Sequence, residues 1–210
     1  MKKLMIVLWF SYSSFVWAST EGDALKALLE PVTRMEAHFK QKVMNEKGKV
    51  LQSTSGTLWL QKPGKFRWEI KGDAARWVVS DGKQVWDYDA DLSQVSIRKL
   101  FQKEEKLPIS FLSGDVSTLE QDFKIKTCTS TSDTCFELIP KESSNAKDEK
   151  QGIFQNIQLR FKEKVLIELK TLDQLGQQTV FTFSNVKNNQ PIAPTRFQFV
   201  PPKGVDVIGE

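Results

Sequence analysis

Hydrophobic and polar residues alternate along most of the chain, and this pattern predicts a protein built mainly of β-strands. One amphipathic helix precedes them over Asp23 to Arg34, where leucine and valine recur at i, i+3, i+4 and i+7. Pro31 is expected to bend this helix or to end it nearby. From Ala37 the period changes to two residues, with turn formers such as Pro63-Gly64 and Asp81-Gly82 between the segments. The predicted strands are 37–44, 52–60, 65–70, 76–80, 84–88, 94–99, 123–128, 135–140, 153–161, 165–172, 179–185 and 195–200.

The arrangement of these strands predicts an unclosed half-barrel. Tight turns join neighbours in sequence, so the sheet is expected to be antiparallel, and a sheet of about twelve strands must curl or cover its faces. Phe66, Trp68 and Ile70 share one face of their strand. Pro108 suits the first turn of a short helix and Gly114 its end, so residues 107–121 are expected to form one or two short helices. The fold class is therefore mainly β (α+β), an antiparallel half-barrel with a lid of short helices.

Four tryptophans, Trp59, Trp68, Trp77 and Trp86, fall nine residues apart, each in its own predicted strand. Aromatic side chains at alternating strand positions usually form a core. A curled sheet under a removable helical cover also provides an aromatic cavity suited to acyl chains. We therefore expect these tryptophans to line a hydrophobic cavity, with core packing as the alternative.

The first 18 residues have the form of a secretory signal peptide. Lys2 and Lys3 precede an apolar run over 4–16, and Val16-Trp17-Ala18 places small residues where a signal peptidase reads them. An uncleaved anchor is the alternative, but the run is shorter than the ~20 residues of a spanning helix. We expect cleavage after Ala18, export to the periplasm, and a single domain over residues 19–210.

Charge argues against a nucleic-acid partner. The 210 residues include 30 Lys and Arg and 26 Asp and Glu, and removing Lys2 and Lys3 leaves a nearly neutral mature chain. These charges are interspersed, whereas nucleic-acid binding requires a basic stripe.

Two cysteines, Cys128 and Cys135, lie in two predicted strands joined by a Ser/Thr/Asp-rich loop. In an oxidising compartment this spacing predicts a disulfide across a hairpin. A metal site is the alternative, but it would have only two thiols and one distant histidine.

Candidate catalytic groups are few. His38 is the single histidine, with no nucleophile motif beside it, and the elbow, zincin, P-loop and dinucleotide motifs are absent. Asp87, Asp89 and Asp91 alternate, but Leu92 and Arg98 stand where a calcium loop needs Gly and Glu. We expect a solvated loop there, no cofactor, and a binding protein rather than an enzyme; a secreted hydrolase is the alternative from another class.

Several segments resemble the LolA family of periplasmic carriers of outer-membrane lipoproteins. The segments run in family order: Ala37 to Lys42, Lys62-Pro63 followed by Phe66-x-Trp68, Val79 to Trp86, Leu107 to Leu112 and Phe197 to Val207. Together they extend over nearly the whole mature chain.

The resemblance implies a monomeric carrier that accepts lipoproteins from the inner-membrane transporter LolCDE and passes them to the outer-membrane receptor LolB. It also implies that Phe66 and Trp68 are cavity positions and that Ile109, Phe111 and Leu112 belong to the lid. On this basis Phe66→Glu is expected to abolish lipoprotein uptake and leave the fold intact.

The resemblance further implies a latch between the barrel and its lid. The family typically has an Arg before the proline at position 63, where this chain has Lys62, which keeps the charge but lacks the planar guanidinium. Arg67 lies nearby and is a second candidate for the latch. A LolB-like acceptor or an envelope-stress sensor on the same fold is the alternative, although LolB-like proteins carry a lipid-anchoring Cys where this chain has Ser19.

Overall fold

The structure is a computed structural model, and it describes residues 20–72, 75–100, 112–113, 116, 119–129, 133–141 and 154–209. Helix α1 (Glu21–Leu29) comes first, and α3 (Leu119–Asp122) lies between the two halves of the sheet in sequence. The strands are β1 (Arg34–Met44), β2 (Val50–Gln61), β3 (Lys65–Ile70), β4 (Arg76–Asp81), β5 (Gln84–Asp89), β6 (Gln94–Lys99), β7 (Phe123–Thr127), β8 (Thr134–Pro140), β9 (Phe154–Lys162), β10 (Val165–Asp173), β11 (Gln178–Asn188) and β12 (Asp206–Ile208).

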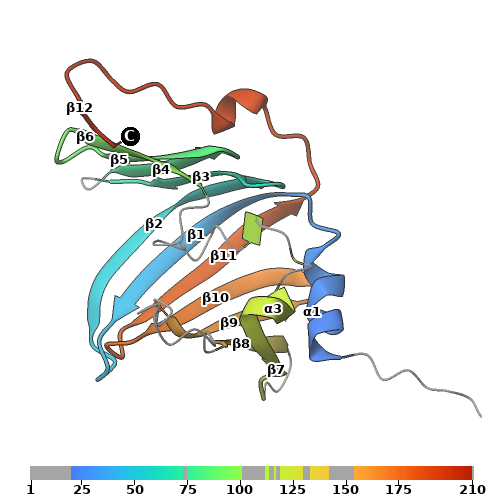
Figure 1. The fold of residues 1–210 in the computed structure, drawn as a ribbon. Coiled ribbons are helices and arrows are strands. Elements are labelled where there is room, and N and C mark those ends of the chain that lie inside the picture. Colours follow the sequence, from blue (N-terminus) through green and yellow to red (C-terminus); the bar gives the residue numbers. More distant parts are fainter. Residues whose placement is uncertain are drawn as a thin grey trace, which may run out of the picture.

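These strands form one strongly curved sheet with the order β12-β6-β5-β4-β3-β2-β1-β11-β10-β9-β8-β7 (Figure 1). The long strands β1 and β2 join two walls, β3–β6 on one side and β7–β11 on the other. The two ends of this order do not pair with each other, so the barrel is not closed. The predicted half-barrel is confirmed.

Helix α1 begins with a capping box in which Thr20 and Asp23 bond each other's backbone N–H groups. It ends at Leu29, close to Pro31 where the sequence predicted a bend or an end, so it is shorter than the full predicted range to Arg34. Proline removes a helical hydrogen bond, and the chain turns into β1 at Arg34 instead.

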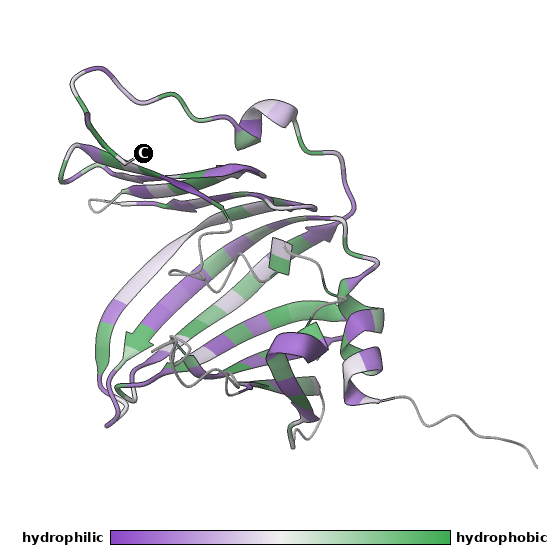
Figure 2. Ribbon diagram, viewed as in Figure 1, coloured by the Kyte–Doolittle hydropathy of each residue, from purple (hydrophilic) through white to green (hydrophobic). Residues whose placement is uncertain are grey.

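Hydrophobic and hydrophilic positions alternate along the strands, as Figure 2 shows. The concave face carries the main core, to which α1 and residues 112–119 contribute Leu25, Leu29, Leu112, Val116 and Leu119. One close approach in this core depends on a glycine: a Cβ at Gly56 would lie 2.6 Å from the ring of Phe39, which covers it. The concave face is therefore the packed interior of the half-barrel.

The C-terminal segment differs from its prediction. Residues 195–200, expected as a strand, instead contain the 3₁₀ helix η2 (Pro194–Phe197) followed by irregular chain. Prolines at 194, 201 and 202 cannot donate hydrogen bonds to a ladder, so this stretch crosses the convex side of β3–β6 (Figure 1). It ends in β12, which pairs with β6 in parallel, so the sheet is not wholly antiparallel as expected.

Candidate functional site

A hollow of about 280 Å³ lies on the concave side, between the two walls of the half-barrel. The side chains that line it are mostly apolar and come from β1, β3, β4 and β9–β11. They are Gln41, Trp68, Ile70, Arg76, Val78, Phe154, Leu169, Thr171, Thr179, Phe181 and Phe183.

Trp68 is the aromatic centre of this hollow. Its ring stacks on Phe39, with centroids 3.8 Å apart and planes inclined by 25°. It also makes a T-shaped contact with Phe181, with ring centroids 5.1 Å apart, and this contact spans from β3 to β11. Trp68 thus lies where the two walls approach each other.

Phe66 lies on the same face of β3 but is completely buried within the core and is not among the lining residues. A glutamate at this position would place a charge in the packed interior and destabilise the protein. Phe66→Glu is therefore expected to disturb the fold, contrary to the expectation from the sequence.

The other three tryptophans lie on the convex face. The pairs Trp59↔Arg67 and Glu69↔Trp77 place Trp59 and Trp77 on the face opposite Trp68. Trp86 pairs with Val79 and shares that convex face. The sequence placed these three tryptophans beside Trp68 in one cavity, but the structure places them on the opposite face of the sheet. The register of each hairpin decides which face a residue takes, and the regular spacing of nine residues does not.

Residues of the C-terminal segment cover these convex tryptophans. The guanidinium of Arg196 lies 4.5 Å from the centre of the Trp59 ring, and Phe199 packs against Trp77. Phe197 is buried on this side together with Val79. The convex aromatics belong to a second, smaller packed layer.

A cover over one end of the concave face consists of α1 and the described residues of 112–122. Leu112 of the predicted lid is buried in the core, whereas Ile109 and Phe111 lie outside the described residues. The backbone N–H of Gly64 donates to the carbonyl of Ser113 at 2.9 Å. The buried hydroxyl of Ser80 donates to the Gly64 carbonyl at 2.8 Å. Strand β4 therefore fixes the β2–β3 turn, and this turn bonds the cover at Ser113.

The two candidate latch residues take different positions. Nζ of Lys62 donates to the carbonyl oxygen of Leu29 at 2.7 Å, and therefore ties the β2–β3 turn to the C-terminal end of α1. Arg67 lies on the convex face, where its Nε bonds Glu69 and its guanidinium lies 5.5 Å from the Trp77 ring. Lys62 thus contacts the cover, whereas Arg67 contacts the C-terminal side.

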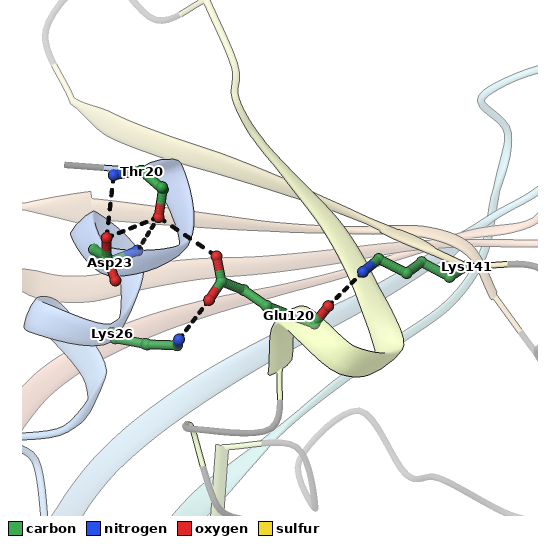
Figure 3. A network of polar contacts seen from close by, with 5 residues as sticks. All are labelled: Thr20, Asp23, Lys26, Glu120 and Lys141. Atoms are coloured by element: carbon green, nitrogen blue, oxygen red, sulfur yellow. Dashed lines mark hydrogen bonds and ion pairs between the residues drawn. The ribbon is translucent and has the colours of Figure 1, made fainter. Parts of the chain in front are cut away.

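A second connection, which the sequence did not suggest, joins α3 to α1 (Figure 3). The carboxylate of Glu120 accepts a hydrogen bond from Nζ of Lys26 at 2.5 Å and lies 3.4 Å from the hydroxyl of Thr20. Its backbone carbonyl accepts from Lys141 at 2.6 Å. A Cβ at Gly22 would lie 1.9 Å from Oε1 of Glu120, so glycine makes room for this carboxylate.

The polar contacts of this connection shift two pKa values. The hydrogen bond to Glu120 raises the pKa of Lys26 above its ordinary value. Side-chain and backbone hydrogen bonds from Thr20 lower the pKa of Asp23. Both shifts stabilise the charged forms in which the helix start and the Glu120 contact are made.

An ion pair at the hollow was likewise not expected from the sequence. Arg76 donates two hydrogen bonds to Asp87, from Nε at 2.7 Å and from Nη2 at 2.6 Å. Asp87 therefore does not belong to a solvated loop as expected, since its side chain is only 9% exposed. The sequence signal that could have revealed this ion pair is the position of Arg76 and Asp87 in neighbouring predicted strands, each on the concave face of its strand.

The disulfide prediction is confirmed: Cys128 and Cys135 are bonded and close the β7–β8 hairpin. His38 is exposed, with Nδ1 3.5 Å from the amide nitrogen of Asn185. Within the described residues, no group of three or more His, Cys, Asp or Glu side chains is placed to hold a metal ion. No helix in the same part of the chain is long and apolar enough to cross a membrane.

Comparisons with known proteins agree with this architecture. The family model of "Outer membrane lipoprotein carrier protein LolA" matches residues 30–200. An outer-membrane lipoprotein carrier protein of Legionella pneumophila (strain Corby) is 36% identical over 208 residues, which cover 99% of both chains. A protein of the same name from Coxiella burnetii (strain CbuK_Q154) is 35% identical over 207 residues, covering 98% of this chain and 95% of the relative.

One solved structure is similar in fold at low sequence identity. It is an uncharacterized conserved protein from Thermus thermophilus, with a TM-score of 0.53 and 14% identity, covering 89% of this chain and 99% of the other. The likeness of sequence to the carrier proteins extends over the hollow, the cover and the C-terminal segment alike. This chain belongs to the LolA family of outer-membrane lipoprotein carrier proteins.

Proposed function

We propose that this chain is a periplasmic lipoprotein carrier, which takes up the acyl chains of lipoproteins in the hollow around Trp68. The observation that carries the proposal is an apolar, aromatic hollow on the concave face of a half-barrel in a chain of the LolA family. The curated relatives are named outer-membrane lipoprotein carrier proteins. The family match also favours a carrier over the hydrolase alternative.

The physical need for such a carrier follows from the acyl chains of the cargo. Each CH₂ group transferred from water into an apolar environment contributes about 0.8 kcal/mol, so an acylated protein does not leave a membrane unaided. Transfer into a hollow lined by Trp68, Phe181 and Phe183 gives the acyl chain an apolar environment in place of the membrane interior. The carrier therefore substitutes protein surface for membrane during transit.

Uptake of several acyl chains requires the interior to widen. The hollow of about 280 Å³ is slightly smaller than ordinary ligand pockets, which have volumes of about 300–1,000 Å³. The contacts of Lys62 with α1 and of Gly64 with Ser113 are those that must yield if the cover moves. Release then depends on different affinities of the open and closed states for cargo.

The finer steps of the proposal concern location and partners. Cleavage after Ala18 would deliver residues 19–210 to the periplasm as a monomer. There the carrier would receive cargo from a LolCDE-type transporter and pass it to a LolB-type receptor. A mature chain beginning at Ser19 would carry no thiol there for lipid attachment, which suits a carrier better than an anchored acceptor.

A release assay tests this function. Mature protein is added to spheroplasts that make a labelled outer-membrane lipoprotein, and the supernatant is examined for a soluble one-to-one complex. We expect stoichiometric release by the wild type. Absence of release with cognate membranes and a working positive control would reject the carrier function.

Ile70→Glu locates the cargo site better than Phe66→Glu. Ile70 lines the hollow and is only half-buried, so a carboxylate there stays near solvent but charges the site. The matched control is Val200→Glu, because Val200 is 84% exposed on the C-terminal segment. We expect loss of release for Ile70→Glu and normal release for Val200→Glu; equal release by both would remove this hollow from the cargo site.

A further inference from the structure

Two hairpin tips meet at the end of the sheet away from α1 (Figure 1). One tip joins β1 to β2, and the other joins β10 to β11. Strand register places Met44 opposite Gln178, and a Cβ at Gly176 would lie 3.3 Å from Cβ of Glu46, so the two tips touch. Residues 42–51 and 173–178 together are called the hairpin rim.

The hairpin rim presents aliphatic side chains to solvent. Val50 and Leu51 are exposed at the start of β2, and Leu175 is 86% exposed on the β10–β11 turn. Single exposed aliphatic residues are common on protein surfaces, but these three gather on two touching turns. A group of this kind marks a surface that contacts an apolar partner.

Both tips are held in shape by a side chain that caps the turn. Oδ1 of Asn45 accepts two backbone hydrogen bonds within its turn, at 3.1 and 2.9 Å. Oδ1 of Asp173 accepts two more, from the N–H groups of Leu175 and Gln177 at 2.9 and 2.8 Å. The aliphatic side chains are therefore presented from ordered turns, which reduces the entropy lost when they make a contact.

Lysines flank these aliphatic side chains. Lys42, Lys47 and Lys49 are exposed on the β1–β2 hairpin, and none of them forms an ion pair with a described residue. The same rim carries two carboxylates, of which Glu46 is exposed and Asp173 is engaged by its own turn. Three lysines against two carboxylates leave the hairpin rim with a charge of +1.

The strands behind the rim add to this positive charge. The next charged residue along β1 is Lys40, and the next along β10 is Lys170. No carboxylate along these two strands therefore lies between the rim and a further lysine. Lysines near a bilayer attract anionic headgroups, by about fivefold in affinity for each lysine.

The shape of the rim favours a lipid surface over a folded protein as the partner. Strand β3 ends at Ile70, opposite Gly56, whereas β2 begins at Val50, so about 20 Å of the β1–β2 hairpin projects beyond β3. A projecting edge offers much less area than the roughly 800 Å² per partner of a stable protein interface. It suits the insertion of a few side chains into a fluid apolar layer, with lysines at the level of the headgroups.

We propose that the hairpin rim is a membrane-contact site, which binds the surface of a phospholipid bilayer with anionic headgroups. Val50, Leu51 and Leu175 enter the boundary between headgroups and acyl chains, and the lysines meet phosphate oxygens. The hollow lies directly behind the rim, because its lining residues Gln41 and Thr179 lie near the rim ends of β1 and β11. The contact rests on the rim alone, and with the proposed function it would bring the hollow to the membrane that holds the acyl chains.

Sedimentation with vesicles tests the inference on the mature protein without lipoprotein. Vesicles of phosphatidylcholine are compared with vesicles that also contain phosphatidylglycerol, each at low and at high salt. We expect binding to the anionic vesicles at low salt and weaker binding to phosphatidylcholine alone. The difference should disappear in 1 M salt, because the Debye length falls to about 3 Å.

Variants of the rim separate the apolar from the electrostatic contribution. Leu175→Glu should weaken binding to anionic vesicles at least about tenfold, because an inserted side chain is lost and a negative charge is added. Val200→Glu is the matched control, since Val200 is as exposed as Leu175 but lies on the C-terminal segment. Lys47→Gln/Lys49→Gln should reduce the preference for phosphatidylglycerol by about tenfold or more and leave binding to phosphatidylcholine unchanged.

Insertion is measured directly with tryptophans at the same two positions. Leu175→Trp and Val200→Trp are mixed with vesicles whose acyl chains carry bromine, and the wild-type signal is subtracted. We expect quenching of the tryptophan at position 175 and none at position 200. Both positions are exposed, so neither substitution should move the urea midpoint.

Three results would overturn the inference: no binding of the wild type to anionic vesicles, equal binding by Leu175→Glu and Val200→Glu, or a dimer that Leu175→Glu abolishes. The last of these would assign the rim to a second copy of the chain. Vesicle binding is measured without cargo, so its failure beside normal lipoprotein release rejects only the membrane contact. Normal vesicle binding beside absent release rejects only the carrier function.

Discussion

The concave and convex faces of the wall β3–β6 are both rich in aromatic residues, but these residues have different surroundings on the two faces. On the concave face, Trp68 borders a hollow and the packing around it leaves room. On the convex face, Trp59 and Trp77 are covered by a segment of the same chain. An aromatic strand residue therefore borders a hollow only where no other segment of the chain covers it.

The first way to break this comparison is to remove one buried phenylalanine from each face. Phe66→Ala should lower the free energy of unfolding by about 3–5 kcal/mol, because Phe66 is completely buried in a core that cannot collapse around the loss. Phe197→Ala should cost less, near the lower end of the same range of about 3–5 kcal/mol, because Phe197 is buried in the smaller convex layer. Urea unfolding measures both.

Function should separate the same two variants. Phe197→Ala is expected to retain lipoprotein release, because the convex layer does not border the hollow. Equal losses of stability, or loss of release in Phe197→Ala, would show that the two faces act as one core.

Removal of the disulfide tests how the far concave wall is held. Replacing Cys128 and Cys135 by serine should lower the free energy of unfolding by about 2–3 kcal/mol, because the bond closes a short loop in the unfolded chain. A reductant should lower the wild type by a similar amount and leave the double variant unchanged. A wild type indifferent to reductant would contradict this assignment.

A smaller effect is expected at the convex cation–π contact. Arg196→Met should cost about 0.5–1 kcal/mol, since the guanidinium lies over the face of Trp59 at a partly exposed site. Indole fluorescence of Trp59 should change with it, while lipoprotein release stays normal. Unchanged stability would mean that the other contacts of the segment, such as those of Phe197 and Phe199 and the hydrogen bonds from Arg67 to its carbonyls, hold it without this one.

The smallest effect should come from the Glu120 contact and should depend on pH. The pKa of Lys26 is raised in the folded state by its hydrogen bond to Glu120. The stability from this contact is therefore fully present below the ordinary lysine pKa of 10.5 and is lost as the pH rises through the higher folded value.

Comparison of the wild type with Glu120→Ala across this range measures the effect. The difference in urea midpoint should shrink above pH 10.5, and this pH dependence should be absent in the Lys26→Met background. If the difference in urea midpoint did not change with pH, the ion pair of Lys26 with Glu120 would not stabilise the contact between α3 and α1. Packing of Leu119 would then account for it.

Much of the architecture follows from local pattern. Alternation along β3 from Lys65 to Ile70 predicts the strand and both its faces, since the side-chain period of a strand is two. The stripe of Leu25 and Leu29 predicts α1, and the cysteine spacing predicts the β7–β8 disulfide. The family resemblance, carried by ordered segments, is also readable from sequence.

The site itself is less readable, because its residues come from strands far apart in the chain. Phe181 and Phe183 of β11 meet Trp68 of β3 across the half-barrel, and no local pattern pairs them. Arg76 and Asp87 meet through the register of the β4–β5 hairpin. Contacts of this kind depend on how the whole sheet curls.

The sequence by itself determined strands β1 to β11, the first helix and the disulfide, because each depends on the periodicity or spacing of neighbouring residues. Only the tertiary structure decided that Trp68 faces the hollow while Trp59, Trp77 and Trp86 face the C-terminal segment. The side of a strand on which a residue lies is set by hairpin register, and a shift of one residue reverses it. What covers that side is then decided by a segment more than a hundred residues away, whose prolines keep it out of the expected strand.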